Sequence, residues 1–208
     1  MVMFCHYAVM IQGSERGWLN FFYTGVDLFF VISGFIFAPT VLVPAKENVT
    51  AFVIRRIFRV YPLFLAAIFL YALLPDKVWD NSIILQHALF LHTSVSKEIA
   101  FYYNPAFWSL PVEVEFYLLI TLFVLFKIRN TKHLLLLLFA LSLLCSIFVH
   151  FFLTTDSYAK LVLTHHLPNI LSEFLLGVLA YQICKKCSKL QGVIFGVAGL
   201  ILLYILGQ

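Results

Sequence analysis

Long apolar runs alternate with short polar segments along this chain of 208 residues. A helix that crosses a membrane needs about 20 mainly apolar residues. Runs that reach or approach this length predict spans at 19–43, 60–75, 107–126, 134–153, 165–184 and 191–207. The pattern therefore predicts an all-α fold, a polytopic transmembrane helix bundle of about six full spans.

Two further apolar segments are too short to cross a membrane. Residues 1–11 fit the outer half of a first helix whose beginning precedes Met1. Residues 83–93 fit a re-entrant or interfacial segment better than a span. We expect residues 1–208 to form a single membrane-embedded domain that is incomplete, with a partial first helix.

The composition excludes an ordinary soluble domain. Hydrophobic residues make up 62% of the chain and charged residues 12%, whereas soluble domains are roughly half apolar and about a quarter charged. The net charge of +4 does not indicate nucleic-acid binding, because the basic residues sit in short clusters between apolar runs. Cys184 and Cys187 form a single C-x-x-C pair, so no four-ligand metal site is expected.

The basic residues orient the predicted spans. Cytoplasmic loops carry an excess of Lys and Arg, and most of the Lys and Arg residues here fall in three alternate loops, 44–59, 127–133 and 185–189. The remaining loops hold only Arg16, Lys77, Lys97 and Lys160. The clusters therefore predict that 44–59, 127–133 and 185–189 face the cytoplasm, and that 12–18, 76–106 and 154–164 face outward.

Acidic residues lie inside the apolar runs. Asp27, Glu113 and Glu173 each come about six residues from the outer end of a span, which is roughly 9 Å deep at the helical rise. His6 is at a similar depth, about 8 Å. An imidazole and three carboxylates in one layer are typical of an intramembrane proton-handling or substrate site. A single such residue is as well explained by packing or by pairing with a buried arginine.

The start of the 107–126 run carries helix-capping signals. Ser109 can cap a helix, Pro111 suits a first turn, and Glu113 then lies near the positive helix end. Glu115 is two residues from Glu113, so the two carboxylates point to nearly opposite faces.

A basic cluster marks the predicted cytoplasmic start of the 60–75 run. In "FVIRRIFRVYP", Arg55, Arg56 and Arg59 are spaced three and four residues apart, so two or all three can share one helical face. Guanidinium groups bind phosphates through paired hydrogen bonds. The alternative is plain topology-setting charge or contact with lipid headgroups.

Several motifs occur together in order, "GVDLFFVISGF" (25–35), "RRIFRVYP" (55–62), "FWSLPVEVEFYLL" (107–119) and "EFLLGVLAY" (173–181). In these motifs the chain resembles the acyltransferase-3 family, integral-membrane acyltransferases that modify bacterial cell-envelope glycans and related acceptors. The resemblance implies transfer of an acyl group from a cytoplasmic acyl-CoA, such as acetyl-CoA, to a hydroxyl on the outer side. It also implies a multi-pass protein of the bacterial plasma membrane.

The resemblance carries over to individual residues. It assigns catalytic positions to His6, Asp27 and Glu113, donor-binding positions to Arg56 and Arg59 with Arg55 beside them, and supporting positions to Ser33, Trp108, Ser109 and Glu173. Pro111 and Glu115 depart from the family's usual serine and glutamine. An arginine that the family carries before the histidine would precede Met1, so we expect a fragment or a degenerate copy.

These observations predict a membrane acyltransferase without a permanently bound cofactor. His6 would take the proton of the acceptor hydroxyl, and Asp27 or Glu113 would orient the imidazole. The partners would be the bilayer, acyl-CoA and a hydroxyl-bearing glycan. Two alternatives remain open: a proton-coupled transporter or flippase, for which buried carboxylates and a histidine are also suited, and an inactive partner subunit.

Overall fold

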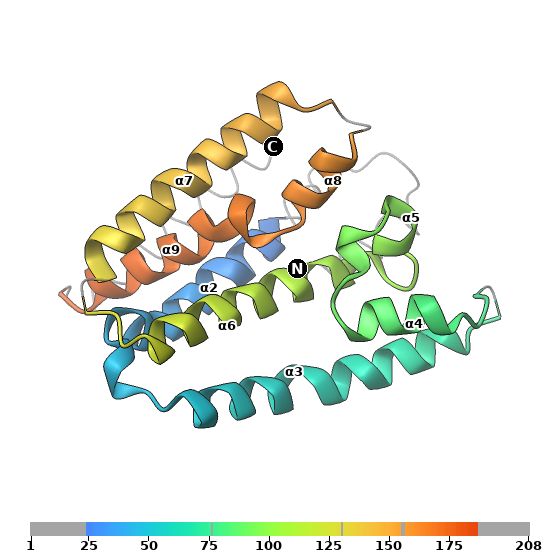
Figure 1. Ribbon diagram of the computed structural model, residues 1–208, viewed down its shortest axis with the longest axis horizontal. Helices are drawn as coiled ribbons and strands as arrows, with labels where there is room; N and C mark the ends of the chain where they lie inside the picture. Colours follow the sequence, from blue (N-terminus) through green and yellow to red (C-terminus); the bar gives the residue numbers. More distant parts are fainter. Residues whose placement is uncertain (1–23, 76, 130, 155–156, 187–208) are drawn as a thin grey trace. The chain divides into compact units, whose positions relative to one another are not determined.

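The described part of the chain is helical throughout. The computed structural model describes residues 24–75, 77–129, 131–154 and 157–186, and no strand occurs among them (Figure 1). The longer helices are α2 (Thr24–Leu42), α3 (Val49–Ala72), α4 (Asn81–Ala88), α6 (Ser109–Leu125), α7 (Thr131–Phe152), α8 (Tyr158–Thr164) and α9 (Leu167–Cys184). Short turns of helix connect them: η2 (Pro44–Lys46), η3 (His92–Ser94), α5 (Lys97–Ala100) and η4 (Pro105–Trp108). The all-α prediction is confirmed.

Four segments of the described chain are long and apolar enough to cross a membrane. They are Gly25–Leu42, Pro105–Leu125, Thr131–Phe152 and Tyr158–Cys184, and each overlaps one of the spans predicted from hydropathy. This indicates a membrane protein. The predicted span 191–207 and the partial helix 1–11 lie outside the described residues.

The predicted span 60–75 forms the second half of a longer helix. Helix α3 begins at Val49, because the Asn48 side chain caps it by accepting a hydrogen bond from the Ala51 amide (2.9 Å). Its first half carries Arg55, Arg56 and Arg59, so α3 is not among the four span candidates. The basic cluster therefore lies within a helix, where its spacing controls which side chains share a face.

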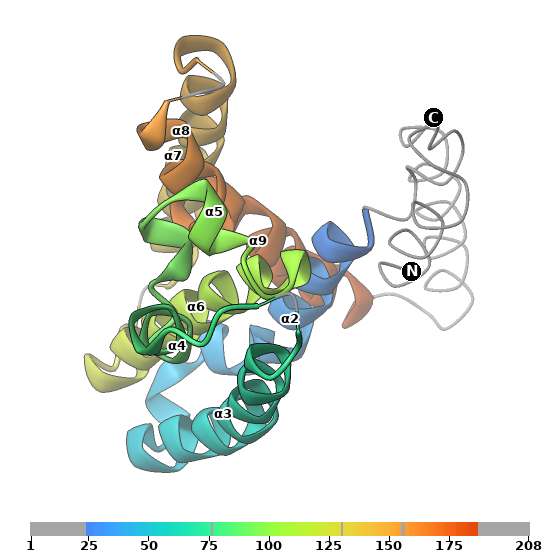
Figure 2. The same cartoon turned by 90° about the vertical axis from the view of Figure 1, so that its right-hand side faces the viewer.

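The segment predicted to be too short for a span forms α4 and η3. Helix α4 packs against α3 (Figures 1 and 2). Phe90 follows α4 and stacks on Phe64 of α3, with 4.8 Å between ring centroids. Ile68 and Tyr103 complete a buried cluster with them. The aromatic contacts therefore hold this segment against α3.

The chain divides into two compact units, Met1–Ala38 with Glu173–Gln208, and Pro39–Ser172. In the described part of the first unit, α2 and α9 cross at two glycines. A Cβ added to Gly34 would lie 1.9 Å from the Phe174 carbonyl oxygen, and one added to Gly177 would lie 1.9 Å from the Val31 carbonyl oxygen. Only glycine allows backbones to approach so closely.

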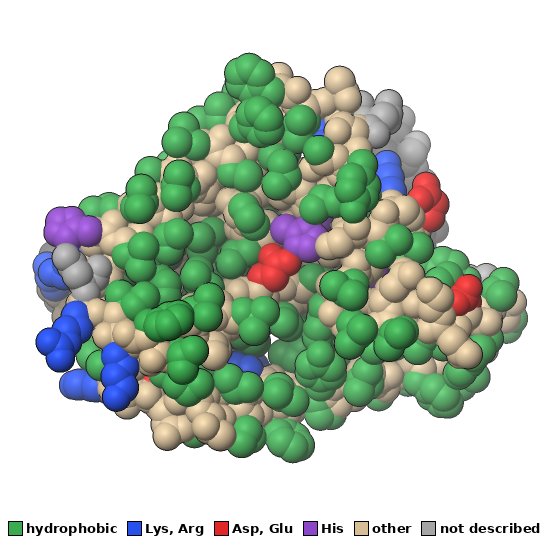
Figure 3. Space-filling model, viewed as in Figure 1, with side chains coloured by type: hydrophobic (Ala, Val, Ile, Leu, Met, Phe, Trp, Pro, Cys, Tyr) green, Lys and Arg blue, Asp and Glu red, His purple; other side chains and the backbone are tan. Residues whose placement is uncertain are grey.

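In the second unit, the connections gather at two ends. Thr131, at the start of α7, donates to the Leu42 carbonyl (3.3 Å), which places the end of α2 next to the start of α7. Figure 3 shows Lys and Arg side chains gathered mostly at this end. At the other end, the Tyr158 hydroxyl of α8 donates to the Ser94 carbonyl of η3 (2.5 Å). The loops 76–106 and 154–164, which were predicted to share the outer side of the membrane, thus contact each other.

Candidate functional site

A charged cluster forms in the second unit where α3 packs against α6. Glu113 and Tyr117 of α6 are both 5% exposed, and the Tyr117 hydroxyl donates to the Glu113 carboxylate. From α3, Arg56 and Arg59 interact electrostatically with Glu113. The Arg56 guanidinium lies over the Tyr117 ring, 5.8 Å from its centroid. We call these four residues the arginine site.

Helical spacing explains how the arginine site assembles. Glu113 and Tyr117 are four residues apart on α6, and Arg56 and Arg59 are three apart on α3, so each pair shares a helical face. Arg55 has a different environment. It pairs with Glu47 at 2.7 Å, and its side chain is 50% exposed. Of the three arginines proposed for donor binding, the structure brings two to the buried carboxylate.

The first unit holds a second acidic group. Asp27 of α2 and Glu173 of α9 are close enough to interact electrostatically. One oxygen of Glu173, Oε2, is buried and has no hydrogen-bond partner among the described residues. Ser33 is buried on the same helix as Asp27. Two of the predicted intramembrane acids thus lie together. His6, their proposed imidazole partner, lies outside the described residues.

Trp108 and Ser109, where η4 meets α6, have structural contacts. The Trp108 ring packs edge-on against His165, with 5.2 Å between centroids. The predicted capping role of Ser109 is wrong, because Ser109 is already the first residue of α6 and its hydroxyl donates to the Ala106 carbonyl (3.0 Å). The preceding turn η4 continues into α6 and takes the place of a separate cap.

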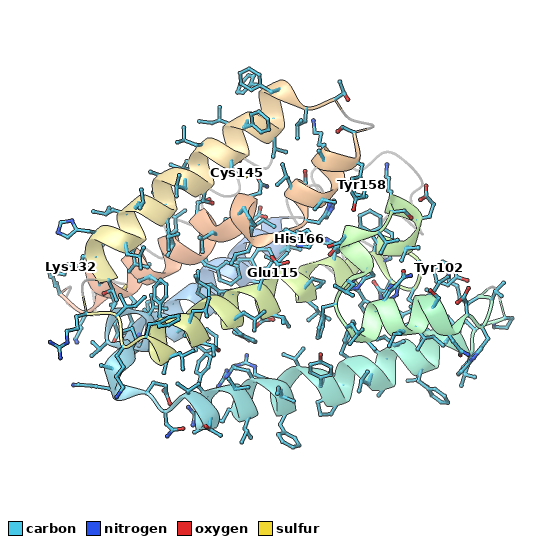
Figure 4. The ribbon with its side chains drawn as sticks, in the orientation of Figure 1. Tyr102, Glu115, Lys132, Cys145, Tyr158 and His166 are labelled. Atoms are coloured by element: carbon cyan, nitrogen blue, oxygen red, sulfur yellow. The ribbon has the colours of Figure 1, made fainter. Side chains whose placement is uncertain are left out.

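A hydrogen-bonded chain that the sequence did not indicate lies on the other face of α6. His166 Nδ1 bonds the Glu115 carboxylate, and the second oxygen of Glu115 accepts from the Leu167 amide (2.7 Å). His166 Nε2 lies 3.0 Å from the Ser94 hydroxyl and 3.3 Å from the Thr93 hydroxyl. Figure 4 shows Glu115 and His166 pointing toward each other, and Figure 3 shows an acid and a histidine side by side on the same face.

The opposite directions predicted for Glu113 and Glu115 are confirmed by these partners. Two features of the sequence could have indicated the hydrogen bonds between Glu115, His166 and Ser94. They are Glu115 in place of the family's glutamine, and the histidine pair 165–166 at the start of an apolar run. Neither feature indicates Ser94 as a partner, because Ser94 is more than 70 residues away from His166 in sequence. In the part of the chain that the structure describes, no group of three or more His, Cys, Asp or Glu residues is arranged to hold a metal ion.

An arginine pair beside a buried carboxylate, in a bundle of apolar helices, defines a membrane protein with a polar site between its helices. Comparison with known proteins assigns it further. The family profile described as "Acyltransferase domain" matches residues 1–208, so the chain belongs to the acyltransferase-3 family.

One curated relative supports the same assignment. The chain is 29% identical over 199 residues to a protein of Acidianus two-tailed virus named "Putative acetyltransferase ORF330". The match covers 91% of this chain and 55% of the viral protein, so the chain spans about half the length of the curated relative it matches. No solved structure matches the chain significantly.

Proposed function

We propose that this chain transfers an acyl group, in the simplest case acetyl, from acyl-CoA to a hydroxyl of a cell-surface glycan. The observation that carries the proposal is the arginine site. Arg56 and Arg59 converge on one face of α3 in a chain that belongs to an acyltransferase family. Guanidinium groups suit the phosphates of coenzyme A, because their paired N–H donors match phosphate oxygens.

Glu113 and Tyr117 have a positioning role in this proposal. Glu113 is buried and accepts from the Tyr117 hydroxyl, and both arginines of α3 interact electrostatically with its carboxyl group at the α3–α6 contact. Arg59 is exposed, so its guanidinium remains accessible to an incoming anion. The site would hold the donor phosphates with Arg56 and Arg59, while Arg55 stays with Glu47.

Acceptor activation is assigned to the acids and the histidine of the first unit. His6 would take the proton from the acceptor hydroxyl, whose oxygen attacks the thioester carbonyl as the coenzyme A thiolate leaves. Asp27 would stabilise the imidazolium, as the acid of a catalytic triad does. Glu113 is less suited to this task than Asp27, because the structure gives it Tyr117 and the arginines as partners.

The test is transfer of labelled acetyl from acetyl-CoA in vesicles that contain the full-length protein and a hydroxyl-bearing oligosaccharide. We expect label in an alkali-labile ester on the oligosaccharide, and a loss of roughly 100-fold or more in His6→Ala, the scale of general-base catalysis. Arg55→Ala is the matched control and should retain most of the activity. If the wild-type protein forms no labelled ester on the oligosaccharide under any condition, the proposal is contradicted.

A proton-coupled transporter is the second candidate, and the Asp27–Glu173 pair is the observation that favours it. Carboxylates that lie together within apolar helices are typical of proton relays. A transporter would move protons across the vesicle membrane in the absence of acyl-CoA, and Asp27→Asn would uncouple that movement. Proton flux without acylated product would decide for this alternative.

A further inference from the structure

We propose that Ser94, His166 and Glu115 form a nucleophile site in which Ser94 carries the acyl group as an ester during transfer. The proposal rests on the proposed acyl-transfer function for its donor. It is carried by the hydrogen-bonded chain on the face of α6 opposite the arginine site, in which a hydroxyl, an imidazole and a carboxylate follow one another.

The order of contacts determines the proton positions. A carboxylate only accepts hydrogen bonds, so the proton of the neutral His166 ring is on Nδ1, which faces Glu115. Nε2 then carries the lone pair and accepts from a hydroxyl. Ser94 is the closer hydroxyl, at 3.0 Å, and this geometry is the one in which an imidazole activates a serine.

Thr93 competes for the same nitrogen but is less suited to react. Its hydroxyl is 3.3 Å from His166 Nε2, and the residue is completely buried. Ser94 is only partly buried. A serine is also less hindered than a threonine at the reacting oxygen, so the acyl group is assigned to Ser94.

Neighbouring groups hold Glu115 and the backbone at Ser94 in position. Glu115 is fixed at both oxygens, by His166 and by the Leu167 amide. The backbone of η3 is tied to α8 by the Tyr158 hydroxyl, which donates to the Ser94 carbonyl. The side chain of His166 is 15% exposed and that of Glu115 is 29% exposed, so neither side chain is sealed from the surface of the second unit (Figure 3).

Acyl transfer through Ser94 takes place in two steps. The Ser94 oxygen attacks the thioester carbonyl, its proton passes to His166 Nε2, the C–S bond breaks, and His166 returns the proton to the coenzyme A thiolate. In the second step, which replaces the direct attack on the thioester assisted by His6, the acceptor hydroxyl gives its proton to His166 and attacks the Ser94 ester. The Ser94 oxygen leaves and regains the proton, and the acyl ester is now on the acceptor.

The test uses the full-length protein and two probes that react at serine. Incubation with labelled acetyl-CoA without acceptor should place one acetyl group on Ser94, mapped by peptide mass spectrometry. A fluorophosphonate should modify the same residue without any donor. Ser94→Ala should remove both modifications. His166→Gln should slow fluorophosphonate labelling by roughly 100-fold or more. Ser82→Ala is the matched control, because among the described residues the Ser82 hydroxyl of α4 has Gln86 as its hydrogen-bond partner, and this variant should label like the wild type.

Glu115 acts through His166, so its variants need a separate readout. Glu115→Gln keeps an oxygen that can accept from the Leu167 amide but loses the charge beside His166. A purely structural role would leave the fluorophosphonate labelling rate unchanged in Glu115→Gln, whereas the proposal expects a loss of at least tenfold with partial recovery in Glu115→Asp. A wild-type thermal unfolding midpoint in each variant separates lost reactivity from misfolding.

The outcomes separate this inference from the proposed function. If product forms and Ser94→Ala makes it at the wild-type rate, transfer is direct and the inference is overturned, while the proposed function stands. If no acetyl is transferred but fluorophosphonate still labels Ser94 in a His166-dependent manner, the acyl-CoA function fails and the activated serine stands. If neither probe modifies Ser94 in the folded wild-type protein, the inference is wrong.

Discussion

At the scale of single residues, Glu113 shows how a buried carboxyl group is accommodated in an apolar helix. Its carboxylate accepts from Tyr117, one turn further along α6, and faces two arginines of α3. Satisfied networks of this kind fix one arrangement of the side chains, whereas an unpaired buried charge would cost several kcal/mol. The same network sets the direction of Arg56 and Arg59, the residues on which donor binding depends.

Removal of the Tyr117 hydroxyl should destabilise the protein. Tyr117→Phe leaves the Glu113 carboxylate without its hydroxyl donor, at an expected cost of about 1–3 kcal/mol. The matched control is Tyr103→Phe. The Tyr103 hydroxyl is buried and has no hydrogen-bond partner among the described residues, so its removal should be neutral or stabilising. Thermal unfolding of both variants in detergent checks the prediction, and equal midpoints would contradict it.

At the scale of elements, hydropathy predicts where apolar helices lie but not where they begin or what they touch. The start of α3 depends on a cap by Asn48, a local signal that the apolar run 60–75 conceals. The Gly34 contact was predictable, because a glycine inside a span has few other uses. His166 and Ser94 meet through tertiary packing of distant segments, and no spacing rule along the sequence brings them together.

The α4–η3 segment should make stability depend on pH. It lies outside the span candidates, and its two buried histidines, His87 and His92, stack with 4.3 Å between ring centroids. Burial, followed by the proximity of His87, lowers the pKa of His92 from 6.5 to about 4, and burial lowers the pKa of His87 as well. Both rings are therefore neutral in the folded protein at neutral pH.

The unfolded chain binds more protons than the folded one between these pKa values, so stability falls as pH drops below about 6.5 and continues to fall to about 4. For His92 alone the full loss is on the order of 3 kcal/mol. Thermal unfolding midpoints between pH 7 and pH 5 check this. His92→Gln should flatten the profile, while the exposed His133→Gln should leave it unchanged. A wild-type midpoint that does not change over this range would contradict the account.

At the scale of the whole molecule, the connections of the second unit gather at two ends, one basic and one formed by η3 and α8. The positive-inside rule assigns the basic end to the cytoplasm. This orientation matters for function, because it would present the Ser94 side to the acceptor.

Cysteine labelling checks the orientation. In a variant without native cysteines, Lys97→Cys and Lys127→Cys place one thiol at an exposed position in each set of loops. A membrane-impermeant maleimide should modify Lys97→Cys in intact cells and Lys127→Cys only after permeabilisation. The reverse pattern would exchange the proposed donor and acceptor sides.

The central claim is that Arg56 and Arg59 bind the phosphates of the acyl donor. The measurement that tests it most directly is the affinity of the full-length protein for coenzyme A, measured by isothermal titration calorimetry. Arg56→Ala and Arg59→Ala should each weaken binding by about 1.5–3 kcal/mol, the scale of charge-assisted hydrogen bonds. Lysine at either position should restore only part of the affinity, because paired donor geometry is lost. Arg55→Ala should change binding little, since Arg55 is half exposed and paired with Glu47. Wild-type affinity in both Arg56→Ala and Arg59→Ala would contradict the account and leave these arginines as topology signals.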